Sequence, residues 1–400
     1  MSSPRLGSQG RRVAITGYGV VAPSGLGKAA FWQGLNGPGL TSGRTVEIAD
    51  WDPLPYFASP KEARRADRVE QFALAAAAEC FEHAGRPPVD NGRFGTIFAT
   101  GVGGLRSTED QIEVLIEKGE RRVSPFLVPM MMPNAAGAAI SMRYGLRGPN
   151  ETICTACAAS THAIGYAARL ISWGMIDACV TGGSESAGCK IGVSSFGNMT
   201  ALSTIGHSRP FSPERDGFVL GEGAAVFMLE EWRAAIDRGA NIVGEVLGAG
   251  SNADAHHITA PAPGGTGAIA CMQMALHDAG MAPSDIGYIN AHGTSTPLND
   301  AAEAAAVTAV FGPKGVPITS TKGVTGHPLG AAGAMEAAAV LLSMEHSLIP
   351  PTAGTTRVDE GFEIDLVMGT ARAWKPGPAM SNSLGFGGHN GSIILGPPGT

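Results

Sequence analysis

Cys157 stands where a chain of this pattern could present a nucleophile. Residues 151–155 read as a short buried strand, and residues 158–173 are small and apolar and predict a helix. A thiol at a helix N-terminus lies in a positive field, which favours the thiolate over the thiol. We therefore expect an activated thiol at this turn. The alternative is that Cys157 is a small buried apolar residue, as free cysteines most often are.

Polar residues occupy similar positions in the second half of the chain. His292 follows the strand-like run 287–291, and Lys322 and His327 follow the run 317–321. In open α/β sheets, sites form beyond the carboxyl ends of strands, so these side chains are expected to meet Cys157. Each histidine alone is more often structural; together they favour acid–base chemistry beside a thiol.

Two further residues complete the predicted set. Glu336 interrupts the apolar helix predicted at 330–343, where a carboxylate is costly unless it is paired, and Lys322 is the expected partner. Phe386 lies in the glycine loop 385–390. Backbone N–H groups there and at Cys157 could form an oxyanion hole. The alternative for this loop is a simple turn.

Composition excludes several functional classes. The 400 residues are 44% hydrophobic and 16% charged, with a net charge of −7, which argues against general nucleic-acid binding. No apolar run reaches a membrane span, and residues 1–12 read as a short flexible lead without a secretory signal. The six cysteines form no disulfide framework and no zinc-like spacing with histidine, which favours a reducing cytoplasm.

The strand pattern occurs twice. Five strand-like runs of the first half return in the same order in the second half: 12–17, 96–101, 151–156, 177–183 and 223–229, then 243–250, 287–293, 317–322, 379–385 and 392–396. The pattern predicts two similar α/β halves, 1–240 and 241–400, each with its own sheet.

Four blocks resemble the signatures of the β-ketoacyl-[acyl-carrier-protein] synthases, most closely the bacterial type II elongating enzymes. The blocks are 155–160 (Thr-Ala-Cys-Ala-Ala-Ser), 290–297 (Asn-Ala-His-Gly-Thr-Ser-Thr-Pro), 322–327 (Lys-Gly-Val-Thr-Gly-His) and 382–388 (Asn-Ser-Leu-Gly-Phe-Gly-Gly). The resemblance spans nearly the whole chain. It implies a thiolase-like fold with αβαβα layers and two mixed five-stranded sheets. Its two-histidine set is unlike the initiating, short-chain branch of the family.

The resemblance also implies roles. Cys157 would accept the acyl group, and His292 and His327 would promote decarboxylation of a malonyl thioester. Lys322, held by Glu336, would tune them, and the N–H groups of Cys157 and Phe386 would hold the oxyanion. Phe386 would gate access of the malonyl unit. The substrate-binding residues implied are Thr294, Thr296, Thr259, Phe196, Thr108 and Met132.

Partners follow from the same resemblance. An acidic acyl carrier protein would dock on basic residues, namely Lys61, Arg64, Arg65, Arg121 and Arg122; alternatively, the cluster at 60–68 is a solvated helix start. The substrates would be acyl and malonyl thioesters on phosphopantetheine, with no separate cofactor. Some relatives hold a monovalent cation at positions matching Asn290, Glu336, Ser381 and Asn382. The chain would be a homodimer, or a heterodimer with a related subunit.

Two departures from the family pattern leave the pathway open. His389 replaces the usual threonine of the glycine loop, and 103–108 is more polar than the usual acyl-pocket floor. A secondary-metabolic ketosynthase making polyketide or polyene chains is therefore the alternative to fatty-acid elongation. A cysteine hydrolase, a non-catalytic chain-length subunit and a thiolase are the other rivals. The chain-length subunit lacks the cysteine, and a thiolase needs a second one near the C-terminus, whereas none follows Cys271.

Overall fold

Two sets of five strands share one strand order. The computed structural model describes residues 10–399, so most of the predicted flexible lead lies outside the described residues. The first half runs in the order β5 (Asn150–Ile153), β4 (Phe94–Ala99), β6 (Ala178–Ser186), β7 (Leu220–Glu231) and β1 (Val13–Ala22). The second half runs in the order β10 (Pro317–Thr319), β9 (Tyr288–Asn290), β14 (Ala379–Gly385), β15 (His389–Gly396) and β8 (Gly244–Ala253).

Each set is mixed in the same way. Three neighbouring strands are parallel, and the next two strands are added antiparallel. The two sets meet where Ala14 and Ile15 of β1 pair with Glu245 and Gly244 of β8, so the two five-stranded sheets are joined edge to edge. The division of the chain near residue 240 stays a prediction.

Several short strands add to this sheet. β2 (Gly25–Leu26) and β3 (Thr45–Val46) pair with β1 and β7, and β12 (Asp365–Leu366) extends the sheet beyond β10. β11 (Leu348–Ile349) and β13 (Arg372–Ala373) form a separate pair.

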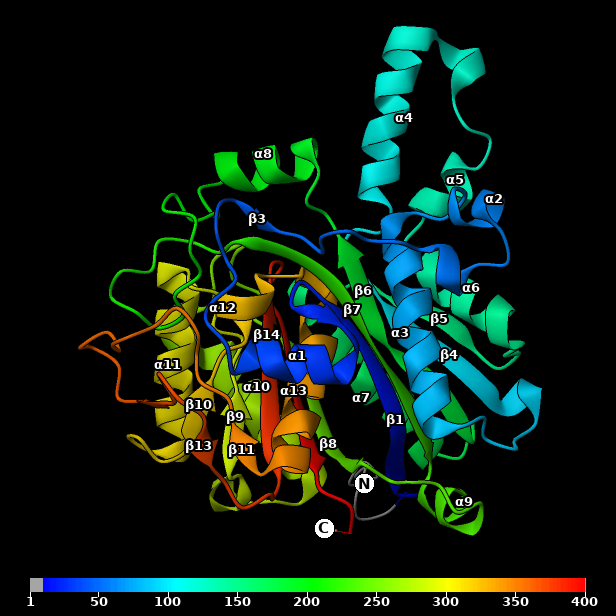
Figure 1. Ribbon diagram of the computed structural model, residues 1–400. Helices are drawn as coiled ribbons and strands as arrows, with labels where there is room; N and C mark the ends of the chain where they lie inside the picture. The colour runs from blue at the N-terminus through cyan, green and yellow to red at the C-terminus, as the bar shows by residue number, and fades with distance from the viewer. Residues whose placement is uncertain (1–9, 400) are drawn as a thin grey trace.

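Six helices build the layers around the sheets (Figure 1). One outer face carries α3 (Arg68–Ala84) and α6 (Ala135–Tyr144), and the other carries α10 (Thr266–Ala279) and α11 (Pro297–Phe311). Between the sheets lie α7 (Ala159–Ser172) and α13 (Ala332–His346). This is the predicted thiolase-like αβαβα arrangement.

Small side chains let the two central helices approach closely. Every residue of α13 from Ala332 to Met344 is buried. A methyl group added at Gly333 would lie 2.0 Å from the hydroxyl oxygen of Thr161 on α7. Because α7 follows β5 and α13 follows β10, this contact brings the carboxyl ends of two distant strands together.

The remaining helices lie at the periphery: α1 (Gly27–Leu35), α2 (Pro60–Ala63), α4 (Leu105–Lys118), α5 (Leu127–Met131), α8 (Lys190–Asn198), α9 (Trp232–Asp237) and α12 (Lys322–Thr325). Figure 1 shows α4 standing away from the body. Apolar side chains on α4 are exposed, and Ile116 is 78% exposed. Within residues 10–399, no helix combines the length and apolarity that a membrane span needs.

Candidate active site

Cys157 lies in a tight turn between β5 and α7. A 3₁₀ turn, Ala156–Ala158, precedes α7, and Ala156 has a φ of +49°, in the region that favours glycine. Such a conformation costs about 1–3 kcal/mol and is kept where the surroundings determine it. Gly385 packs directly against this turn, because an added methyl group would lie 3.1 Å from the backbone N of Cys157. The turn therefore aims the sulfur away from the sheet end into a defined space.

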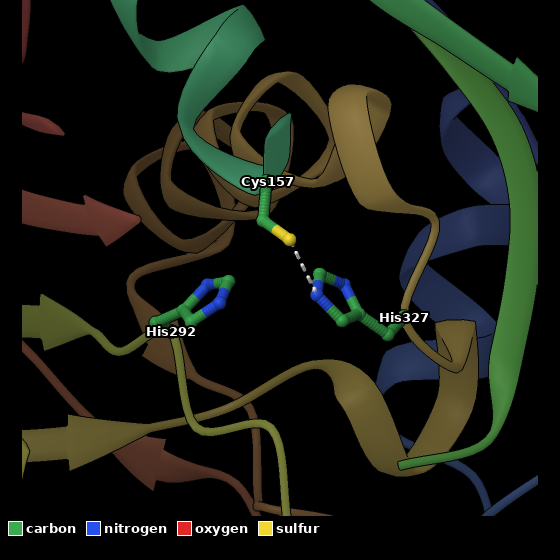
Figure 2. Close-up of side chains that lie close together, drawn as sticks. All are labelled: Cys157, His292 and His327. Atoms are coloured by element: carbon green, nitrogen blue, oxygen red, sulfur yellow. Dashed lines mark hydrogen bonds between the residues drawn. The ribbon is translucent and has the colours of Figure 1, made fainter. Parts of the chain in front are cut away.

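His327 reaches the sulfur from the loop after α12. Its backbone N donates to the oxygen of Val219 at 2.7 Å, and its own oxygen accepts from the N of Gly221 at 3.0 Å. These two bonds attach the loop to the start of β7. The ring Nε2 lies 3.1 Å from Sγ of Cys157 (Figure 2). Among the described residues, Nδ1 of His327 has no hydrogen-bond partner.

His292 approaches from the end of β9. Its ring packs edge-on against that of His327, with centroids 5.1 Å apart and planes at 80°. The backbone N–H groups of His292 and Gly293 each donate to the carboxylate of Glu303 on α11 at 2.8 Å. The two imidazoles and the thiol therefore face one small volume, as Figure 2 shows.

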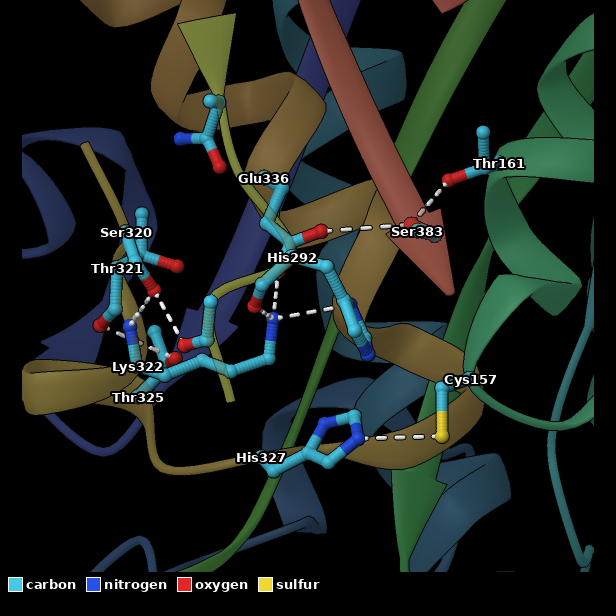
Figure 3. Close-up of polar contacts among 12 residues, drawn as sticks. Cys157, Thr161, His292, Ser320, Thr321, Lys322, Thr325, His327, Glu336 and Ser383 are labelled. Atoms are coloured by element: carbon cyan, nitrogen blue, oxygen red, sulfur yellow. Dashed lines mark hydrogen bonds and ion pairs between the residues drawn. The ribbon is translucent and has the colours of Figure 1, made fainter. Parts of the chain in front are cut away.

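Lys322 fixes the tautomer of His292. Its ammonium contacts the carboxylate of Glu336, the backbone oxygen of His292 and, at 3.3 Å, Nδ1 of the same ring (Figure 3). An ammonium can only donate, so Nδ1 accepts and the ring proton lies on Nε2. The predicted pairing of Lys322 with Glu336 is present. Burial raises the pKa of Glu336, and Lys322 opposes that rise.

Burial controls the protonation of the reacting groups. It raises the pKa of Cys157 to about 11, although Lys322 and the backbone N–H of Phe386 oppose this rise. The loss of water around the sulfur thus outweighs the favourable charges, including the helix position that the sequence indicated, and favours the thiol. Burial, reinforced by Lys322, lowers the pKa of His292 and of His327 well below the ordinary range. Both shifts favour the neutral imidazole.

A cavity of about 320 Å³ opens in front of these groups. It is lined by Cys157, His292 and His327 together with the predicted residues Thr259, Thr294, Thr296, Phe196 and Phe386. The hydroxyls of Thr294 and Thr296 lie 2.9 Å apart. Reactive groups at one end and hydroxyls along the wall suit a thioester on a polar arm.

Two predicted substrate residues do not line this cavity. Thr108 lies in the first turn of α4, and its hydroxyl donates to the oxygen of Gly104 at 2.9 Å. Met132 is 42% exposed. Leu105, at the start of α4, packs against the apolar cluster around Cys157 instead. The roles of Thr108 and Met132 in substrate binding stay predictions.

The sequence interpretation missed two buried carboxylates. Glu303 holds the His292 loop, and burial raises its pKa to about 8. Glu185, at the end of β6, accepts from the N–H groups of Gly101 at 2.6 Å and Gly330 at 3.1 Å. Burial raises the pKa of Glu185 to about 7. The signal that selected Glu336, an acid among small or apolar residues, also applies to Glu185.

The predicted cation residues divide into two groups. Oδ1 of Asn290 and Oγ of Ser381 are buried without a hydrogen-bond partner among the described residues, and strand pairing sets these two residues side by side. Such oxygens fit a hard cation. Oδ1 of Asn382 already accepts from Ser392 at 2.7 Å, and Glu336 is engaged by Lys322.

All predicted docking residues are exposed: Lys61, Arg64 and Arg65 at α2, and Arg121 and Arg122 in the turn after α4. The guanidinium of Arg65 lies 3.8 Å over the ring of Phe126. Their role in docking stays a prediction.

Comparisons with known proteins agree with this geometry. Two family models match: "Beta-ketoacyl synthase, N-terminal domain" over residues 39–235 and "Beta-ketoacyl synthase, C-terminal domain" over residues 243–356. The chain is 40% identical to 3-oxoacyl-[acyl-carrier-protein] synthase 2 of Vibrio cholerae, across 96% of this chain and 99% of the relative. The same enzyme of Staphylococcus aureus strain N315 is also 40% identical, across 97% and 99%.

The solved structures that resemble this chain are also ketosynthases. A β-ketoacyl synthase from Burkholderia phymatum is 32% identical, covers 97% of this chain and 99% of its own, and has a TM-score of 0.89. A type II polyketide ketosynthase in complex with its acyl-carrier protein is 31% identical, covers 97% and 100%, and also has a TM-score of 0.89. The chain belongs to the β-ketoacyl synthase family.

Proposed function

We propose that the protein is a 3-oxoacyl-[acyl-carrier-protein] synthase that joins an acyl group on Cys157 to the two-carbon unit of malonyl-acyl carrier protein. The observation that carries this proposal is the set of a buried thiol 3.1 Å from one neutral imidazole and facing a second whose Nε2 carries the proton. A hydrolase would need only one of these histidines. The 40% identity to enzymes named 3-oxoacyl-[acyl-carrier-protein] synthase 2 also supports it.

Acylation comes first. The sulfur of Cys157 attacks the carbonyl carbon of the carrier thioester as its proton leaves to Nε2 of His327. The N–H groups of Cys157 and Phe386 stabilise the oxyanion. The intermediate collapses, the carbon–sulfur bond to the carrier breaks, and His327 returns the proton to the departing thiolate. Neutral His327 can act in this way because burial lowers its pKa.

Condensation follows on the malonyl thioester. The Nε2–H group of His292 donates to its carbonyl oxygen, and His327 adds a second donor once its ring proton has moved from Nδ1 to Nε2 through water in the cavity. The electrons left when CO₂ departs are thereby held as an enolate. The enolate carbon attacks the acyl carbon on Cys157, and the bond to the sulfur breaks. Loss of CO₂ replaces a strong base and makes the step irreversible. Lys322 contributes by keeping the proton of His292 on Nε2.

The residues that line the cavity indicate where the phosphopantetheine arm of the substrate would bind. Thr294 and Thr296 would bond the amides of phosphopantetheine, with Thr259 further out and Phe386 as the gate. Phe196 would contact the acyl chain. Thr108 and Met132 would reach it only with a second subunit. The exposed edge of β5 and the apolar face of α4 suit a dimer, homodimeric or with a related subunit.

The proposals for carrier-protein docking and for a bound cation rest on the charge and the chemistry of the residues concerned. The basic residues at α2 and after α4 would receive the acidic carrier protein in the cytoplasm. The oxygens of Asn290 and Ser381 would hold a monovalent cation that fixes the ends of β9 and β14. Fatty-acid elongation is favoured over a polyketide or polyene pathway, because the polyketide ketosynthase is the more distant relative at 31%.

Mass spectrometry of purified protein with acyl- and malonyl-carrier substrates tests this. The wild type should carry the acyl group on Cys157 and release the 3-oxoacyl product. Cys157→Ala should form neither, whereas Cys189→Ala should do both. Full condensation by Cys157→Ala would refute the proposal. Malonyl decarboxylation by Cys157→Gln would exclude a hydrolase, and a panel of acyl donors would identify the pathway.

A further inference from the structure

Cys157, His292 and His327 form a ligand set that the sequence could not predict from spacing. One ligand atom from each lies within 4.8 Å of the others, and all three residues are buried. They come from three separate strand-end loops. Figure 2 shows the three side chains converging on one volume. Cys–His–His with an open fourth position is a ligand set that zinc takes in proteins.

The distances lie close to those of a zinc site. Bonds of about 2.3 Å to sulfur and about 2.0 Å to nitrogen place tetrahedral ligand atoms roughly 3.5 Å apart. Sγ of Cys157 and Nε2 of His327 are 3.1 Å apart, and no pair exceeds 4.8 Å. Side-chain movements of about 1 Å would therefore place the three ligand atoms at three corners of a tetrahedron around the metal ion. The fourth corner faces the cavity, through which a hydrated ion can arrive.

The protons can be accounted for. The thiol of Cys157 must lose its proton to solvent. His292 must move its proton from Nε2 to Nδ1, which breaks the 3.3 Å contact with Lys322. Lys322 keeps its contacts with Glu336 and the backbone oxygen of His292. Lys322 thus weakens the site without removing it, while the lone pair of His327 needs no such change.

We infer that Cys157, His292 and His327 bind Zn²⁺, and that the bound metal blocks acylation of Cys157. Zinc occupies the sulfur lone pair that attacks the thioester, so metal and acyl group exclude each other. The ligand set is soft, which disfavours Mg²⁺ and Ca²⁺. This site goes beyond the proposed function and does not depend on it, because a chain without synthase activity would still bind the metal.

Cobalt spectroscopy on chelator-treated, full-length protein tests the site. Co²⁺ should bind once per chain, with intense tetrahedral d–d bands and thiolate charge transfer, and Zn²⁺ should displace it. Cys157→Ser should weaken binding at least 100-fold, and His327→Ala at least 10-fold. Cys154→Ser, at an exposed thiol, should change binding less than twofold. Mg²⁺ should displace nothing.

A second measurement avoids variants that fail to fold. In the Cys154→Ser protein, Zn²⁺ should slow alkylation of Cys157 by iodoacetamide at least 10-fold, and alkylated protein should lose the cobalt bands. Retained bands after alkylation or in Cys157→Ser, or unchanged alkylation at saturating Zn²⁺, would overturn the inference. These readouts need no condensation, so their failure is separate from that of the proposed function.

Discussion

Replacing Glu185 by glutamine removes a buried charge while keeping its contacts. One oxygen of Glu185 accepts from the N–H groups of Gly101 and Gly330, and the other accepts from the hydroxyl of Thr100 at 3.1 Å. A glutamine can place its carbonyl oxygen on the two N–H groups. Its amide can donate to the hydroxyl, which also accepts. Glu185→Gln therefore isolates the cost of ionisation.

The magnitude follows from the change in pKa on folding. Burial raises the pKa of Glu185 from 4.5 to about 7. A carboxyl group with a raised pKa binds its proton more tightly in the folded protein. Its contribution to stability is full below pH 4.5 and is lost as the pH rises through 7. The loss amounts to about 3 kcal/mol by pH 8. The variant has no such group, so its free energy of unfolding relative to the wild type should rise by that amount.

Urea unfolding of both proteins at intervals from pH 4.5 to 8 measures this difference. The variant should gain stability relative to the wild type with rising pH, most steeply between 5 and 7. Glu360→Gln, at an exposed carboxylate, should give a flat difference. A flat or falling difference for Glu185→Gln would show that the three contacts offset the burial and that Glu185 is ionised at no cost.

Three other substitutions test the fold, the docking surface and the site. Gly333→Ala should destabilise the protein by about 1–3 kcal/mol in thermal unfolding, because its methyl group would overlap α7. In the control Gly361→Ala, the added methyl group meets no atom within 4 Å, so the stability should change by less than about 0.5 kcal/mol. Equal effects of the two substitutions would contradict the close approach of α7 and α13. Arg64→Glu should raise the KM for carrier-bound substrate about fivefold at low salt but leave the KM for a pantetheine thioester unchanged. The control Arg357→Glu should change neither KM. Equal effects of the two variants would show that Arg64 is not part of the docking surface. Lys322→Met should slow malonyl decarboxylation at least 100-fold in a CO₂-release assay, because the Nε2–H tautomer is no longer fixed, and a loss under threefold would contradict that role.

The repeated strands and the convergence of their ends could be predicted from the sequence, whereas the order of the strands in the sheet comes from the structure. The repeated runs indicate the strands, and parallel strands place their carboxyl ends at one edge. That reasoning was enough to bring Cys157, His292 and Lys322 together. The joining of β1 to β8 could not be predicted, since two backbone pairs at a sheet edge leave no side-chain pattern. The position of Thr108 outside the cavity could not be predicted, because its hydroxyl bonds to the backbone oxygen of Gly104 within its own helix.

The pKa of Cys157 could not be predicted from the sequence for a different reason. Its pKa depends on how completely water is removed, and neighbouring residues in the chain do not determine that. Helix position favours the thiolate, whereas the layers above and below the sulfur favour the thiol by more. Under the proposed function, the reactive form would be made when substrate arrives, by transfer of the proton to His327.

Buried acids explain how the site keeps its shape. Loops at strand ends leave backbone N–H groups without a partner in a helix or sheet, and buried groups of this kind need a partner inside the protein. Glu185 and Glu303 accept these N–H groups inside the protein, and Glu336 holds the ammonium that orients His292. Each acid thus connects one strand-end loop to a neighbouring element. Because Cys157 has no charge to hold the histidines in place, their geometry must come from these contacts, and the site can stay neutral until a thioester enters it.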